Sequence, residues 1–157
     1  MEELKKIIIA NQIEVVIPTY FEKVVDKQLN VENTIREKIV ENAYFKITDE
    51  DVELNFILMD EEFKSQDMAE IIQNLYNIFS RLVPGFTKIE VLRSKINGIE
   101  AAAIQYKSNA LTYDLYNMYV IYNSPGKKFA VNAHCKYDES EKWQSIFFEI
   151  AESVKII

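Results

Sequence analysis

NMYVIYNSPGKKFAVNAHC, residues 117–135, has an apolar stretch on each side of Pro125-Gly126. A Pro-Gly pair suits the centre of a type II turn, so this region predicts two antiparallel strands, 113–123 and 127–136. Side chains alternate between the faces of a strand, and facing residues of an antiparallel pair share a face. A two- or four-residue loop therefore gathers one apolar set, namely Tyr116, Met118, Val120, Tyr122, Phe129, Val131, Ala133 and Cys135.

A second hairpin precedes this one. Asn97-Gly98 is a strong two-residue turn signal, and it joins the predicted strands 87–96 and 99–107. We expect one side of this hairpin to be apolar, with the facing pairs Ile96 and Ile99, Val91 and Ile104, and Ile89 and Tyr106. Its other side then carries Lys88, Glu90, Ser94, Ala101, Ala103, Gln105 and Lys107.

Two amphipathic helices are predicted, over residues 68–83 and 139–154, because apolar residues recur there every three or four positions. Asp67 suits the N-cap of the first helix, and Pro84-Gly85 ends it. Upstream, Asp49-Glu50 turns residues 43–48 into a strand at 52–59, and residues 13–17 form an earlier strand. We expect an α+β fold in which both helices cover the apolar face of one antiparallel sheet.

The sequence does not determine the secondary structure of residues 24–42. Ile35, Ile39 and Val40 fit a weak helix, but this segment has no convincing cap.

Length and net charge limit the number of domains and the kinds of partner that we expect for this chain. A chain of 157 residues with 48% hydrophobic residues suits a single domain, 1–157. A formal charge of −7 repels phosphate backbones and anionic lipid, so we expect neither nucleic acid nor a membrane as partner, whereas a basic protein is permitted. A single cysteine and the lack of a signal-peptide apolar core favour the cytoplasm.

Few residues suggest catalysis. His134 and Cys135 are adjacent, but neighbours in a strand point to opposite faces, so we expect Cys135 in the core and His134 on the reverse side. The acidic clusters 49–53 and 60–62 lack the glycine of a calcium loop and suit turns instead. With three glycines and one histidine, we expect no cofactor and no metal site.

The reverse face of the predicted sheet is the best candidate for a binding surface. It mixes aromatic, aliphatic and neutral polar side chains, a composition typical of partner surfaces. The alternative is that residues 24–42 or the N-terminal strand pack over it. The candidate partner-binding residues are Tyr113, Leu115, Asn117, Tyr119, Ile121 and His134.

Several stretches together resemble small bacterial proteins of the PsbP-like fold: IEVVIPTYF, VELNFILMD, LVPGF at the end of the first helix, INGIEAAAIQYKS, NMYVIYNSPGKKFAVNAHC and EKWQSIFFEIAESVKI. This superfamily is named for an extrinsic subunit of photosystem II, and it includes a Ran-GTPase-binding release factor and chaperones of secreted bacterial toxins. The resemblance covers most of the chain from Ile13 onward. It implies an antiparallel sheet with packed helices and a non-enzymatic, protein-binding role.

Three hypotheses follow. The first is a cytosolic binding protein, an adaptor, chaperone or inhibitor, that holds a protein partner on the Tyr119 side of its sheet. The second is a small enzyme that uses a carboxylate or Cys135. The third is a structural homodimer that buries the same tyrosine face.

Overall fold

The computed structural model describes residues 3–25, 38–64, 67–124 and 126–157. Seven antiparallel strands form the main sheet in the order β3-β4-β5-β9-β8-β7-β6. Their bounds are β3 Glu22–Val24, β4 Ile39–Lys46, β5 Glu53–Met59, β6 Thr87–Ile96, β7 Ile99–Asn109, β8 Asp114–Ser124 and β9 Lys127–Lys136. A smaller sheet has the order β1-β2-β10, formed by β1 Leu4–Ile9, β2 Ile13–Pro18 and β10 Lys155–Ile156.

The three predicted hairpins are confirmed. In the β8–β9 hairpin, Tyr122 lies opposite Phe129 and Asn117 lies opposite His134. Asn97 and Gly98 both have positive φ, 48° and 83°, as the predicted turn requires. The chain therefore reverses direction where its turn residues indicate.

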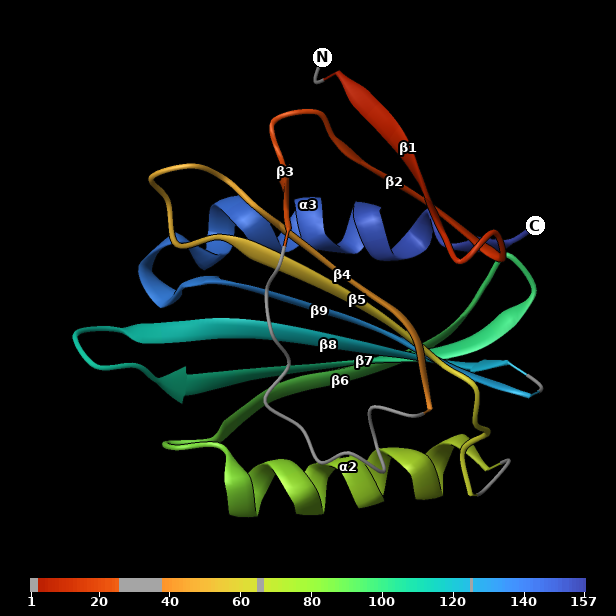
Figure 1. Ribbon diagram of the computed structural model, residues 1–157. Coiled ribbons are helices and arrows are strands. Elements are labelled where there is room, and N and C mark those ends of the chain that lie inside the picture. Colours follow the sequence, from red (N-terminus) through yellow and green to blue (C-terminus); the bar gives the residue numbers. More distant parts are fainter. Residues whose placement is uncertain (1–2, 26–37, 65–66, 125) are drawn as a thin grey trace.

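Helix α3 Ser140–Glu152 and the β1–β2 hairpin cover one face of the main sheet, seen above the sheet in Figure 1. The predicted apolar set from β8 and β9 lies on this face, together with Leu54, Phe56 and Leu58 of β5. Trp143 and Phe147 of α3 complete this core. Because strand alternation alone assigned these residues to one face, this core was predictable from the sequence.

Helix α2 Met68–Leu82 lies on the opposite face (Figure 1), and the prediction that both helices cover the same face is wrong. Asp67 caps this helix as predicted, accepting a hydrogen bond of 2.9 Å from the Ala69 amide. The apolar stripe of α2 packs on Ala102 and Ile121, which lie between core residues along their strands. The central strands are apolar on both faces, so each face requires its own cover.

The predicted faces of the β6–β7 hairpin also need correction. Val91 pairs with Ile104 as expected, but this pair lies on the α2 side, whereas Ile96 lies on the α3 side. The reason is that residues 91 and 96 are an odd number of positions apart. Ala101 and Ala103, expected on the reverse side, belong to the α3-side core.

A second correction concerns Ile89. The register shifts between Lys88 and Glu90, so Lys88 rather than Ile89 lies opposite Tyr106. A shift of this kind inserts an extra residue that the alternation of side chains does not reveal.

The sequence pattern does not reveal the short strands β3 and β10, and it does not determine the structure of residues 24–42. Val24 ends β3, and β4 begins at Ile39, so Ile39 and Val40 belong to a strand rather than to a helix. Ile35 lies outside the described residues. Strands of two or three residues, such as β10 and β3, are too short to produce an alternating pattern.

Candidate binding surface

Five of the six residues proposed as a partner surface lie in β8 and β9 on the α2 side of the sheet, and Tyr113 directly precedes β8. Helix α2 covers only part of this group. Ile121 is fully buried against Met68 and Ile71 of the helix. Tyr119 packs edge-on against Phe79 of α2 with 5.2 Å between ring centroids, and burial raises the pKa of its hydroxyl to about 12. The helix thus covers one end of the predicted surface, at Tyr119 and Ile121.

Asn117 is also buried, and it has a structural role. Its side-chain nitrogen donates to the Ser108 hydroxyl at 2.8 Å and to the Tyr106 carbonyl at 3.4 Å. A buried amide with these partners fixes the pairing of β7 and β8 and does not face solvent.

Tyr113, Leu115 and His134 remain partly exposed and line a shallow hollow of about 490 Å³. The rest of the lining comes from the β4–β5 turn region, between Lys46 and Glu53. This hollow lies at the end of the sheet where β8 begins and β4 turns into β5, at the left of Figure 1. Structure therefore brings together three of the six predicted residues and adds a turn that the sequence did not place beside them.

Polar contacts hold the hollow in shape. His134 Nε2 lies 3.0 Å from Glu53 Oε2 across the β5–β9 pair. The Tyr113 hydroxyl donates to the Asp51 carboxylate, and this hydrogen bond raises the pKa of the phenol. The ammonium of Lys136 stands 5.1 Å from the centroid of the Tyr113 ring.

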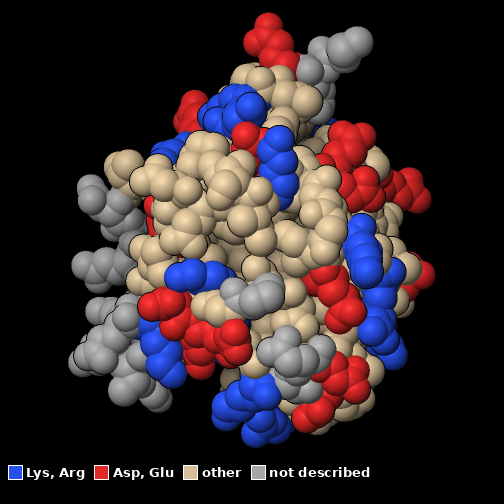
Figure 2. Space-filling view, turned by 90° about the vertical axis from the view of Figure 1, so that its right-hand side faces the viewer, with Lys and Arg blue, Asp and Glu red and all other residues tan. Residues whose placement is uncertain are grey.

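The hollow is acidic. Its lining contains four carboxylates, against one lysine and one histidine: Asp49, Glu50, Asp51, Glu53, Lys46 and His134. The surface is different at the other end of the molecule, where basic and acidic side chains lie interspersed (Figure 2). Carboxylates concentrated around a concave surface attract basic groups.

A row of polar side chains, the polar row, continues from the hollow along the same face of the sheet. Asn55 and Asn132 face each other one pleat beyond the Glu53–His134 pair, and Asn42 lies on the neighbouring strand β4. Their buried side-chain oxygens, and the nitrogen of Asn42, have no hydrogen-bond partner among the described residues.

The residues considered for catalysis lie apart. Cys135 is fully buried on the α3 side and His134 is on the α2 side, as predicted from strand alternation. Burial raises the pKa of the Cys135 thiol to about 12, so the nucleophilic thiolate is strongly disfavoured. Among the described residues, no group of three or more His, Cys, Asp or Glu side chains is arranged to hold a metal ion.

The second acidic cluster has local partners, as expected of a loop. Asp60 forms an ion pair with Lys127 at 3.0 Å, and Glu61 with Lys38 at 3.3 Å. These contacts tie the loop after β5 to the start of β9 and to the residue directly before β4, so this cluster has a structural role.

The sheet with one helix on each face defines the class: the protein has the PsbP-like fold. Comparisons with protein-family profiles and with curated protein sequences find no match. No helix in the described part of the chain is long and apolar enough to cross a membrane.

Several solved structures have a similar fold. The chain is similar to CyanoP, the cyanobacterial PsbP of Synechocystis, with a TM-score of 0.68 and 13% identity over 100% of this chain and 94% of that one. A mutant of Mog1 matches with a TM-score of 0.65 and 11% sequence identity, over 99% of this chain and 96% of that one. LpqN, involved in cell envelope biogenesis of Mycobacterium tuberculosis, matches with a TM-score of 0.59 and 16% sequence identity, over 92% of this chain and 82% of that one. At these identities the structural similarity establishes the fold. Function has to be argued from the surface residues of this chain.

Proposed function

We propose that the protein is a non-enzymatic, cytoplasmic protein-binding module, an adaptor, chaperone or inhibitor, whose partner contacts the hollow lined by Tyr113, Leu115 and His134. The observation that carries this proposal is the hollow itself. It combines an aromatic ring, an aliphatic side chain and an imidazole with four carboxylates at one end of the sheet. Tyrosine is enriched at protein interfaces, and the acidic rim selects a partner with basic side chains.

Two observations favour binding over catalysis and over a homodimer through the tyrosine face. The single thiol is buried and held neutral, so Cys135 is poorly suited to act as a nucleophile. Helix α2 already covers Tyr119 and Ile121, so a second copy cannot pack on them without displacing the helix.

The test is capture of partners from the native host with the purified protein, followed by affinity measurement with the captured protein. Tyr113→Ala and Leu115→Ala should each weaken binding at least about fivefold, because side chains at the centre of an interface carry most of its affinity. Affinity should also fall as ionic strength rises, because the carboxylates attract a basic partner.

Tyr137→Ala is the matched control. Tyr137 is another partly exposed tyrosine with a lysine over its ring, Lys107 at 4.8 Å, and it does not line the hollow. Equal losses of affinity in the Tyr113 and Tyr137 variants, or no loss in either hollow variant, would refute the proposal.

A further inference from the structure

Strand β6 is the long exposed edge of the main sheet. It has ten residues, it is last in the strand order, and among the strands that the structure describes its neighbour is β7. Nine of its ten side chains are at least partly exposed, and the Leu92 side chain is 41% exposed. The opposite edge, β3, has three residues. A long edge strand presents backbone N–H and C=O groups that can pair with another extended segment.

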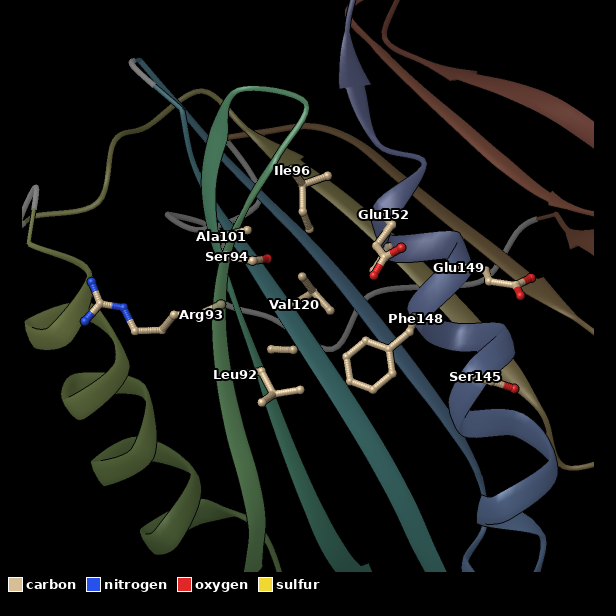
Figure 3. A pocket seen from close by; sticks show the side chains of 13 residues that line it. Leu92, Arg93, Ser94, Ile96, Ala101, Val120, Ser145, Phe148, Glu149 and Glu152 are labelled. Carbon is tan, nitrogen blue, oxygen red and sulfur yellow. The ribbon is translucent and has the colours of Figure 1, made fainter.

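An apolar hollow lies beside this edge, on the α3 side. Its volume is about 580 Å³, and it is bordered by β6, β7 and the outer side of α3. The hollow exists because β7 carries only methyl groups there, at Ala101 and Ala103. Figure 3 shows Leu92 and Phe148 on either side of it. Side chains of a strand added to β6 would lie about 5 Å from those of β6, within reach of this space.

Charge is divided between the two sides of the edge. The α3 side carries carboxylates: Glu90 of β6 lies opposite Gln105, and Glu149 and Glu152 of α3 border the hollow. The α2 side of β6 carries cations at Lys88, Arg93 and Lys95. Figure 3 shows Arg93 pointing away from α3, towards α2, while Glu149 and Glu152 lie on the α3 side.

We propose that β6 accepts an extended segment of a partner protein as an additional strand of the sheet. This segment carries basic and apolar side chains towards α3 and acidic side chains towards α2. It therefore complements Glu149 and Glu152 on one side and Arg93 and Lys95 on the other. The site is separate from the hollow at Tyr113, so this inference goes beyond the proposed function.

A second copy of the chain is the poorer occupant. Antiparallel pairing of two β6 strands would continue each face of the sheet across the junction, so the α3 side would gather carboxylates from both copies. The α2 side would likewise gather Arg93 and Lys95 from both. Like charges across adjacent strands are destabilising, whereas a segment of the opposite pattern relieves them. Charged edges also prevent indiscriminate pairing.

Two dye-labelled synthetic peptides of ten residues test the proposal by fluorescence anisotropy. In the first, lysine and valine alternate with glutamate and threonine, so each face has one sign of charge. The second has the same composition, with lysine and glutamate mixed on both faces. We expect the first peptide to bind about tenfold more tightly, because several exposed charge pairs each add a modest contribution.

Point variants locate the site. Glu149→Lys should weaken binding of the first peptide about fivefold, while Glu141→Lys, the same change on the same helix outside the hollow, should have less than a twofold effect. Both positions are exposed, so the fold should survive each change. Tyr113→Ala, at the other surface, should leave peptide binding unchanged, so failure here and failure of the proposed function can be told apart.

Hydrogen exchange gives the signature of strand addition. Binding of the first peptide should slow the exchange of alternate amides of β6, because every second N–H of an edge strand points outward. Equal affinity for the two peptides, or no protection in β6, would overturn the proposal. It would also fall if sedimentation showed a dimer that Leu92→Lys dissociates, because the occupant would then be a second copy.

Discussion

Replacing Ile121 by alanine tests whether α2 covers the second face of the sheet. The Ile121 side chain is fully buried, and it contacts Met68 and Ile71 of α2 and Ala102 of β7. Truncating a buried isoleucine to alanine costs about 2–5 kcal/mol, from lost burial and the cavity left behind. Since α2 can partly settle into the space, we expect a loss near the middle of that range, about 3 kcal/mol of unfolding free energy.

Urea denaturation followed by circular dichroism measures this loss. With a slope of about 2 kcal/mol per molar urea, the midpoint should fall by about 1.5 M. Amides of α2 should also exchange faster in the variant, because the helix loses part of its contact with the sheet.

Two variants bracket the result. Leu111→Ala removes a fully exposed leucine and should change stability by less than about 0.5 kcal/mol. Val120→Ala, one residue away on the α3 side, should be destabilising because Val120 is also buried. If Ile121→Ala behaved like Leu111→Ala while Val120→Ala was destabilising, the second face would be open and the placement of α2 would be incorrect.

Three other predictions can be checked by the same denaturation assay. Tyr122→Phe removes the 2.6 Å hydrogen bond from the tyrosine hydroxyl to the Ala151 carbonyl in the core, and should cost about 1–3 kcal/mol. Ion pairs with two lysines lower the pKa of Glu14, so its charged form contributes stability that is present above its ordinary pKa of 4.5 and lost as pH falls through the lowered value. Glu14→Gln should therefore be less stable than wild type at pH 7, and the difference should shrink in acid; a difference that grew in acid would contradict the argument. Gly85→Ala should destabilise more than Gly98→Ala, because both have positive φ but only the Cβ at position 85 would collide with a neighbouring side chain; equal losses would contradict the clash.

The sequence predicted much of the framework. Turn residues such as Asn97-Gly98 located the hairpins, and apolar periodicity located both long helices to within a few residues. Strand alternation also separated His134 from Cys135 and identified the α3-side core. These features depend on residues that are close together in the chain, so short stretches of sequence were sufficient to predict them.

The candidate site was only half predictable. Tyr113, Leu115 and His134 lie together as the alternation required, but the acidic turn beside them was interpreted as an isolated hairpin turn. Asn117 and Ile121 follow the same alternation and are nevertheless buried. The phase of a residue along its strand indicates the face on which it lies, and it does not indicate what covers that face.

By itself, the sequence determined where the hairpin turns, the longer strands around them and both long helices lie, and which residues share a face of β8 and β9. Tertiary structure alone decided that α2 and α3 lie on opposite faces, that the shift beside Ile89 changes the pairing, and that β6 is left as an edge. The physical reason is that steric preferences and periodicity act between residues close in the chain, whereas the choice of face depends on apolar surface contributed by several distant strands. Ala102 and Ile121 receive α2 because their side of the sheet, too, has apolar surface to remove from water.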